Sequence, residues 1–151
     1  LLRHVEIDVD LPTVKKNAIK HLSYGNNSKL LLGFNGRRWR TEDNNVGMSY
    51  SDNDTQNTWD NSQQQLGDDG GLTFFIGGDD AASLGNGDVK DKASKYLHKL
   101  NQIYPGIKAD YNNKAYRMVW PKFPLTKGSY SAWTVGQYTS IAGSEIETVG
   151  N

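Results

Sequence analysis

The sequence contains no cysteine, and other features that point directly to a function are also scarce. Without cysteine the chain forms no disulfide bond, offers no thiolate nucleophile and builds no cysteine-based zinc site. Its three histidines are scattered and follow no metal-ligand spacing, so no metal site is predicted. No apolar run approaches the roughly 18 residues that a membrane-spanning helix needs. The remaining polar and aromatic side chains must therefore carry the function.

A charge excess of either sign is missing as well. Seventeen basic residues balance seventeen acidic ones, which gives a formal net charge of zero. A protein that binds nucleic acid or an anionic membrane usually carries a basic surface, so neither partner is predicted. With 151 residues the chain is long enough for one domain with its own hydrophobic core.

Both ends of the sequence lack the signals that usually mark a chain terminus. The chain opens on Leu1 without an initiator methionine, a signal segment or a helix cap, and it closes on Asn151 without a terminating element. We interpret residues 1–151 as a domain cut from a longer parent protein.

Hydrophobic periodicity predicts both strands and helices. Alternation or short apolar runs predict strands at 5–9, 28–34, 72–76, 114–120 and 129–135, with shorter ones at 46–50 and 58–59. One helix is expected to begin at Pro12 and end at Gly25. A second begins after its cap Asp88, carries one apolar stripe and stops at Pro105. These elements predict an α+β fold, with a mixed β-sheet backed by helices on one face.

The sequence has no Gly-rich dinucleotide fingerprint, so these residues do not form a site for a cofactor phosphate. The stretch 119–133 is more informative. Trp120 precedes a loop stiffened by two prolines, and Gly128-Ser129-Tyr130-Ser131 follows. Large rings held at the two ends of a stiff loop suit a planar ligand or a small organic cation.

This stretch resembles the flavin-containing amine oxidases, which include monoamine, polyamine and L-amino-acid oxidases and the related histone demethylases. The family pattern is a Trp, seven residues, and then Gly-Ser-Tyr-Ser, as found here from Trp120 to Ser131. Further landmarks occur upstream in the order of the family. They are Leu1-Leu2-Arg3, Leu11-Pro12, the Gly-rich turn before Lys29, and Phe75-Ile76-Gly77-Gly78-Asp79-Asp80-Ala81-Ala82. Only 41–71 has no counterpart in this resemblance.

The resemblance implies a catalytic role for Lys29, which in the family holds a water molecule against the flavin N5 atom. Taken alone, a lysine on an apolar strand more often extends its ammonium to solvent than serves catalysis. Its position in the family pattern favours the catalytic role instead. Arg38-Trp39 occupies the place of the aromatic pair that follows the strand in the family.

The resemblance also assigns roles to residues of the 120–130 loop. Tyr130 corresponds to one wall of an aromatic cage that binds the substrate amine. Trp120, Gly128 and Ser129 correspond to residues beside the flavin. Because Ser129 stands where some members carry a cysteine bonded to the flavin, a non-covalent flavin is expected. Without the family pattern, Tyr130 would be interpreted as an ordinary cross-strand tyrosine and Trp120 equally well as a core residue.

The parent would then be an FAD-dependent amine oxidase. It would pass a hydride from the carbon beside an amine or amino-acid nitrogen to the flavin, and oxygen would reoxidise the flavin to give hydrogen peroxide. The chain would be part of the substrate-binding domain, and its partner would be the FAD-binding domain of the same parent chain. Both FAD-binding portions are missing from the sequence, so the isolated chain is expected to be inactive and to bind FAD weakly.

Two alternatives remain open at this point. One is a non-enzymatic carbohydrate- or peptide-binding α/β module that uses Trp39, Trp59 and Trp133 as exposed rings. The other is a domain of the same scaffold that has lost its redox role and serves interactions. The acidic turns at 52–54 and 68–71 lack the full twelve-residue calcium loop, and we interpret them as solvated turns.

Overall fold

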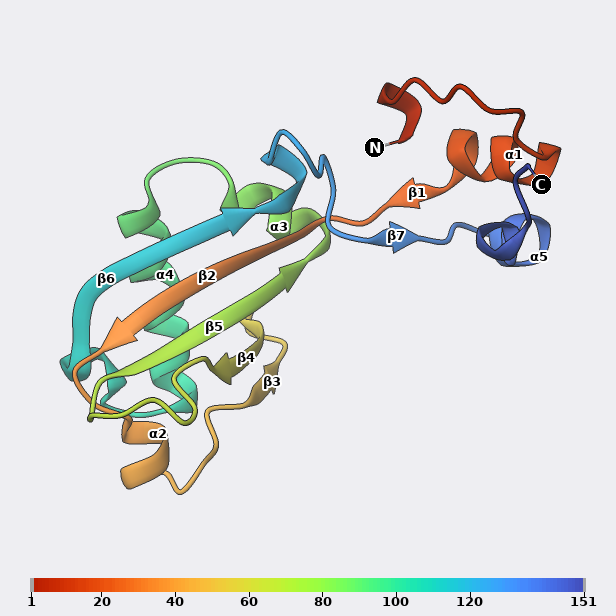
Figure 1. The fold of residues 1–151 in the computed structure, drawn as a ribbon. Coiled ribbons are helices and arrows are strands. Elements are labelled where there is room, and N and C mark those ends of the chain that lie inside the picture. The colour runs from red at the N-terminus through yellow and green to blue at the C-terminus, as the bar shows by residue number, and fades with distance from the viewer. Residues whose placement is uncertain (1, 151) are drawn as a thin grey trace.

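The computed structural model describes residues 2–150, with Leu2 described by its backbone alone. Leu1, which opens the expected entry motif, and Asn151 lie outside the described residues. A large β-sheet with its helices forms one part of the molecule, and a small helical lobe forms the other (Figure 1). A two-stranded ribbon joins the two parts, and both described ends of the chain lie in the lobe.

The main sheet has five strands in the order β3-β4-β5-β2-β6, and β1 pairs with β7 in the ribbon. The strands are β1 Ser23–Tyr24, β2 Asn27–Phe34, β3 Ser49–Ser51, β4 Gln56–Asp60, β5 Gly70–Gly77, β6 Tyr111–Val119 and β7 Ser131–Ala132. The α+β class is confirmed. A mixed sheet was expected, but all the strand pairs in the described part of the chain are antiparallel.

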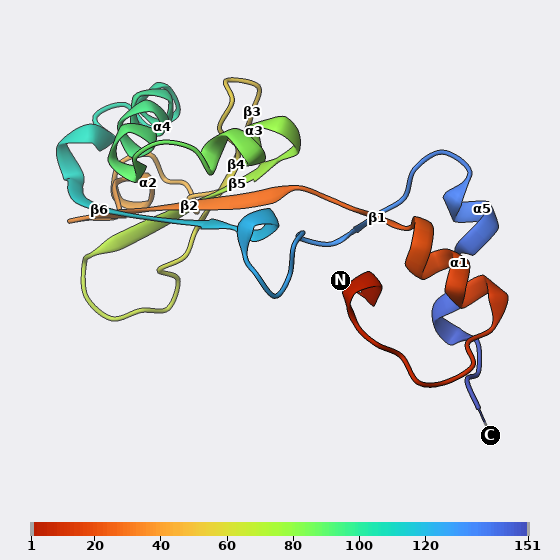
Figure 2. The ribbon, with the colours of Figure 1, turned by 90° about the horizontal axis from the view of Figure 1, so that it is seen from above.

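Helices cover one face of this sheet (Figure 2). The α-helices are α1 Thr13–His21, α2 Arg38–Thr41, α3 Gly78–Leu84, α4 Val89–Ile103 and α5 Gln137–Ile141. Short 3-10 turns are η1 Leu2–His4, η2 Ile107–Asp110, η3 Trp120–Lys122 and η4 Ser144–Ile146. Helices α3 and α4 lie on the same side of the sheet. The apolar stripe of α4 was predicted, whereas α3 forms where the sequence was expected to make a turn after the strand at 72–76.

The core lies between the sheet and these helices. Alternate residues of β2 and β5 point into it, and the register places Leu30 opposite Phe74 and Leu32 opposite Leu72. From α4 the core receives the stripe predicted by the helical period, which includes Tyr96, Leu97 and Leu100. Burying an aliphatic or aromatic side chain of this size contributes about 1.5–3 kcal/mol. This core fixes which face of the sheet remains uncovered.

Helix α4 begins and ends where the sequence predicts. Asp88 is its N-cap, and its Oδ1 accepts a hydrogen bond of 2.6 Å from the Lys90 backbone N–H. After Tyr104 the chain turns at Gly106, whose φ of 90° suits a residue without a Cβ atom. Both ends of α4 are therefore set by residues that lie close to it in the sequence.

The strand predicted at 5–9 is wrong. This segment has no regular structure, and Val5 and Val9 are more than half exposed, at 52% and 57%. Alternation becomes a strand only when a neighbouring strand supplies backbone hydrogen bonds, and no described strand pairs with 5–9.

Two other boundaries also differ. The first helix ends at His21 rather than at Gly25, because Ser23 and Tyr24 leave it to pair with Ala132 and Ser131. The strand expected at 129–135 is reduced to Ser131–Ala132, since β1 offers it just two partners. These short strands form a narrow neck, defined here as residues 23–25 and 128–132.

Candidate active site

The face of the sheet opposite α3 and α4, called here the open face, carries Lys29, Leu31 and Gly33. The neighbouring Ser28 points the other way, since its hydroxyl donates a 2.8 Å hydrogen bond to the Ala81 carbonyl of α3. Strand side chains alternate between faces, so Lys29 emerges on the open face. The turn after β6 and the loop 61–69 hang below the sheet on this side in Figure 2.

Lys29 lies half-buried among aromatic rings on this face. Phe75 is directly opposite it on β5, and Met118 is opposite it on β6. The Lys29 Nζ atom lies 5.5 Å from the ring centroid of Trp59 and 5.7 Å from that of Phe75. At these distances the rings attract the ammonium through their quadrupoles. The lysine is thus a cation held against aromatic surface.

Trp120 opens the turn that follows β6. Its ring meets Phe123 edge to face at 6.1 Å, and its carbonyl accepts a 2.9 Å hydrogen bond from the Thr126 hydroxyl. Pro121 fixes the backbone at the start of the same turn. The indole therefore stands on a braced turn rather than on a mobile loop.

In the neck, the 128–130 segment is fastened to Gly25 by three hydrogen bonds. The Gly25 N–H donates to the Tyr130 carbonyl at 2.7 Å, and the Gly25 carbonyl accepts from the Ser129 N–H at 3.1 Å and its hydroxyl at 2.6 Å. The Tyr130 ring lies over Gly25, where an added Cβ would come within 2.6 Å of Tyr130 Cε2. Ser129 therefore already uses its hydroxyl in the neck.

The five residues proposed from the sequence lie around one end of β2. Lys29 is near the start of that strand, Trp120 follows its neighbour β6, and Gly128, Ser129 and Tyr130 lie in the neck that leads into β2. Among these residues, the structure records no hydrogen bond or ring contact that links Lys29, Trp120 and Tyr130 to one another.

A cavity of about 890 Å³ lies between the neck and the lobe. Tyr24, Lys127 and Trp133 line it from the neck side, and Arg3 and Lys15 line it from the lobe. Sequence reasoning did not select Lys127 or Arg3. The position of Lys127 beside the family motif was a usable signal, whereas Arg3 reaches the cavity only because it binds the carbonyls at the end of α1.

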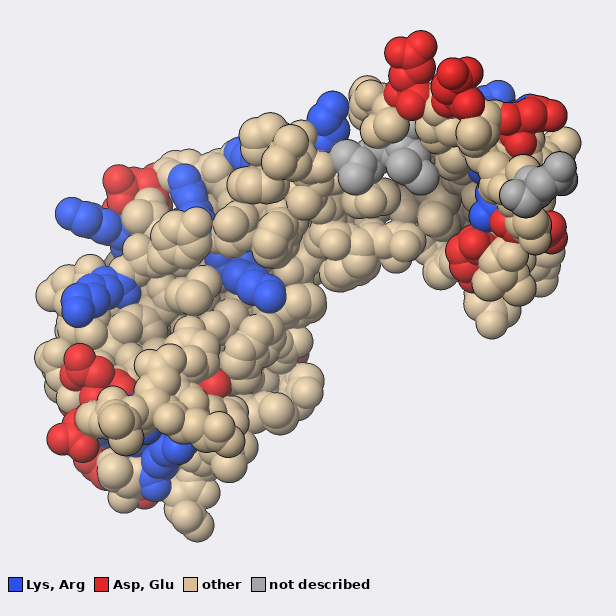
Figure 3. All heavy atoms as spheres, in the orientation of Figure 1, with Lys and Arg blue, Asp and Glu red and all other residues tan. Residues whose placement is uncertain are grey.

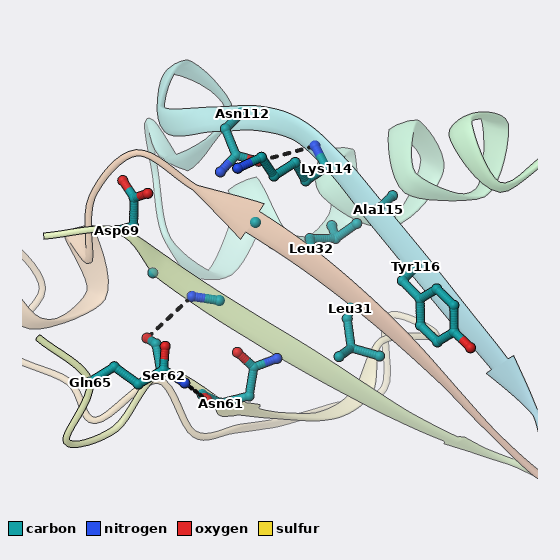
Figure 4. Close-up of a pocket in the computed structure, with 13 residues that line it drawn as sticks. Leu31, Leu32, Asn61, Ser62, Gln65, Asp69, Asn112, Lys114, Ala115 and Tyr116 are labelled. Atoms are coloured by element: carbon teal, nitrogen blue, oxygen red, sulfur yellow. Dashed lines mark hydrogen bonds between the residues drawn. The ribbon is translucent and has the colours of Figure 1, made fainter. Parts of the chain in front are cut away.

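A second cavity of about 360 Å³ lies on the open face at the other end of β2 (Figure 4). Its floor is the cross-strand pair Gly33 and Gly71, which carry no side chains. The amide of Asn112 lies over Gly33 and that of Asn61 lies over Gly71. Its lining is thus more polar than the aromatic region around Lys29.

Charge is distributed unevenly over the molecule. On the face seen in Figure 3, acidic side chains gather on the helical lobe, and the neck between lobe and sheet is largely uncharged. In the described part of the chain, no cluster of three or more His, Asp or Glu side chains is arranged to hold a metal ion. No described helix is long and apolar enough to cross a bilayer.

Asp60 is a structural carboxylate next to Trp59. Burial works to raise its pKa, but hydrogen bonds from Ser62, Trp39 and Arg40 outweigh burial and hold the pKa below its usual value. These bonds tie α2 and the loop 61–69 to the end of β4. Asp60 thereby supports the strand that places Trp59 on the open face.

Residues 2–148 match the family described as flavin containing amine oxidoreductase. The chain belongs to this family. The match covers nearly the whole chain, including the 41–71 stretch, and the family's flavin agrees with the FAD predicted from the sequence. No curated protein shows a significant match to the chain.

Solved structures of amine oxidases share the fold. A mutant of putrescine oxidase matches with a TM-score of 0.79 at 20% identity, over 98% of this chain and 33% of that one. Wild-type putrescine oxidase bound to putrescine matches with a TM-score of 0.66 at 24% identity, over 80% and 26%. Cyclohexylamine oxidase from Brevibacterium oxydans IH-35A gives 0.76 at 16% identity, over 89% and 30%. The chain thus spans a third or less of the length of these proteins.

The family assignment does not favour the alternative of a carbohydrate- or peptide-binding module, and the tryptophans argue against it too. Trp39 was expected to be exposed, but it is fully buried and donates a hydrogen bond to Asp60. Trp59 lies under the Lys29 ammonium, and Trp133 lies in the neck–lobe region against Tyr138. These rings occupy three separate places and form no common binding face.

Proposed function

We propose that residues 1–151 are the sheet-bearing part of the substrate-binding domain of an FAD-dependent amine oxidase. Its substrate would be a small amine or amino acid. The supporting observation is the placement of Lys29 on the open face, at the end of β2 that leads into the neck with Tyr130. The indole of Trp120 follows the neighbouring strand β6 at the same end of the sheet.

In this proposal each residue has a distinct task. Lys29 holds a water molecule by donating a hydrogen bond from its ammonium, which carries three donors. Tyr130 presents a half-exposed ring against which a substrate amine can lie. Trp120 supplies a flat apolar surface on a braced turn, and Gly128 lets neighbouring groups approach the backbone closely.

The described residues fit the ring end of a flavin better than its nucleotide end. Flat aromatic groups such as the Trp120 and Phe123 rings suit a planar ring system. No Gly-rich strand–turn–helix segment is present to bind a diphosphate. The flavin, when bound, supplies the hydride acceptor, and this chain supplies orientation and exclusion of water. The FAD-binding domain of the same parent is the expected partner.

Two experiments test this function. Titration of the purified chain with FAD should give no tight stoichiometric complex, and such a complex would contradict the division of roles proposed here. A fusion that replaces the superimposable third of putrescine oxidase with this chain should form hydrogen peroxide when an amine is added. In that fusion Lys29→Met should lower kcat by about 100-fold or more, which is the scale of a positioned proton-handling group.

Lys114→Met is the matched control, because Lys114 lies on β6 at the far cavity of the open face. It should leave the rate near that of the parent fusion. Equal losses of kcat in both variants would contradict a specific catalytic role of Lys29. A folded, flavin-containing fusion with no amine-dependent peroxide would contradict the proposed activity itself.

A further inference from the structure

Trp59 comes from the 41–71 stretch, where the resemblance to the amine oxidases assigned no functional residue. The structure places it on β4, opposite Thr73, with its ring 5.7 Å from that of Phe75 at an interplanar angle of 42°. Both rings lie on the open face, since Phe75 is directly opposite Lys29 and Thr73 follows the same alternation. A tryptophan, a phenylalanine and a lysine from three different strands therefore meet at one point.

The position of the ammonium shows which way the lysine leans. Strand β5 lies between β2 and β4, so a β2 lysine whose Nζ lies 5.5 Å from the Trp59 ring must reach across β5. This direction takes the ammonium away from β6 on the other side of β2, where Met118 lies opposite Lys29 and Trp120 follows the end of the strand. The Lys29 ammonium therefore lies against the two rings instead of extending freely into solvent.

We propose that Trp59 and Phe75 are positioning residues that hold the Lys29 ammonium over β5. The inference rests on the proposed function, because only there does the location of this ammonium matter for a reaction. It adds that part of the site is built by a segment outside the recognised motifs. It also follows that the β6 side of the open face stays free of the ammonium, so a ring system or substrate can lie there.

Two features of the lysine's surroundings support this role. The Trp59 ring is itself half-buried and lies beside Asp60, whose hydrogen bonds anchor the end of β4. Among the described lysines, Lys29 alone is recorded over aromatic rings. A held ammonium needs less ordering when its water or substrate arrives, which is the usual advantage of a preorganised group.

The test observes Lys29 directly in this chain by NMR with 13C-labelled lysine. Ring currents of Trp59 and Phe75 should move the Lys29 Hε signals upfield of those of Lys114, which serves as the internal reference on the same face. Trp59→Leu should remove most of this shift, and Trp59→Phe should restore a large part of it. Trp133→Leu, in the neck–lobe region, should leave it unchanged.

A second measurement keeps the proposal testable if Trp59→Leu disturbs β4. In Lys29→Met the Trp59 indole N–H signal should move, and in Lys29→Arg it should stay closer to the wild-type position. A double-mutant cycle of Lys29→Met and Phe75→Leu, which removes the second ring, should show coupling of about two- to five-fold in the unfolding equilibrium constant, as expected for a cation–ring contact near the surface.

Lys29 Hε signals that coincide with those of Lys114 in the wild-type chain would overturn the proposal. So would a Trp59→Leu variant that folds normally and keeps the upfield shift. None of these measurements needs flavin or substrate. A failed flavin or fusion experiment would therefore not contradict the positioning of Lys29 by Trp59 and Phe75. Absence of that positioning would in turn not contradict the proposed amine oxidase function, which the fusion experiment tests separately.

Discussion

The ring of Tyr24 packs against the backbone of Gly128 so closely that a Cβ atom on Gly128 would overlap with Tyr24 Cδ1. Across the same neck, Tyr130 packs against Gly25. Each side of the neck thus presents a tyrosine to a glycine of the other side. The neck that carries Ser129 and Tyr130 exists because these two glycines leave room for two aromatic rings.

Gly128→Ala is expected to destabilise the neck, by about 1–3 kcal/mol in the range seen for overpacking. The added methyl group must displace Tyr24, and the β1–β7 pair has few other contacts to compensate. Amide hydrogen exchange of Tyr24 and Gly25 is the direct measurement, because it observes local opening. Gly36→Ala is the control, since nothing lies within 4 Å of a Cβ at that position. Unchanged exchange in Gly128→Ala would show that the neck accommodates the methyl group.

Asp60→Asn is expected to lower the free energy of unfolding by about 1–3 kcal/mol at neutral pH, the cost of leaving buried hydrogen-bonding groups poorly paired. The Asp60 side chain is fully buried against Arg40, and its pKa is held below the usual range. Asp52→Asn is the control, because Asp52 is exposed, and it should change the free energy of unfolding little.

The pH dependence of this difference has a definite sign. Since the pKa of Asp60 is lower in the folded chain than in the unfolded one, its contribution is present above the unfolded pKa of about 3.9 and is lost as the pH falls through the folded pKa. The free energies of unfolding of wild type and Asp60→Asn, measured in urea, should therefore converge as the pH falls below about 5 and through the folded pKa. A difference that stays constant over this range would contradict the assignment.

Asp88→Ala is expected to destabilise the chain by about 1 kcal/mol, because the first turn of α4 loses the acceptor for the Lys90 N–H. Asp88→Ser keeps an oxygen at the cap and should recover most of the loss. Thermal unfolding followed by circular dichroism measures both variants. An Asp88→Ser variant as unstable as Asp88→Ala would show that the side chain acts through charge rather than as a cap.

The helical lobe is expected to open far more readily than the sheet. No residue of α1 is buried, whereas β2 lies between two strands with its helix-facing side chains fully buried. Regions with few buried contacts exchange their amide hydrogens through local opening. Amide exchange should therefore be slowest in β2 and β5 and fast in α1 and α5. Equal protection in both parts would mean that the lobe unfolds only with the sheet.

Local patterns predicted the elements whose stability depends on nearby residues. Helix α4 follows from one apolar stripe, a cap at Asp88 and a stop at Pro105, and β2 from an apolar run that alternates between two faces. The same patterns predicted a strand at 5–9 that is not formed, because alternation cannot show whether a neighbouring strand exists. The buried state of Trp39 was missed for a related reason, since Asp60 and Phe34 come to it from other elements.

The sequence by itself determined the family, the α+β class and the identity of Lys29, Trp120 and Tyr130 as candidates, because each depends on residue types at short, readable spacings. Only the tertiary structure decided that Trp59 and Phe75 face Lys29, that Tyr24 needs Gly128, and that the sheet leaves one face open. Those relationships depend on strand order and register, which are set by packing between segments far apart in the chain.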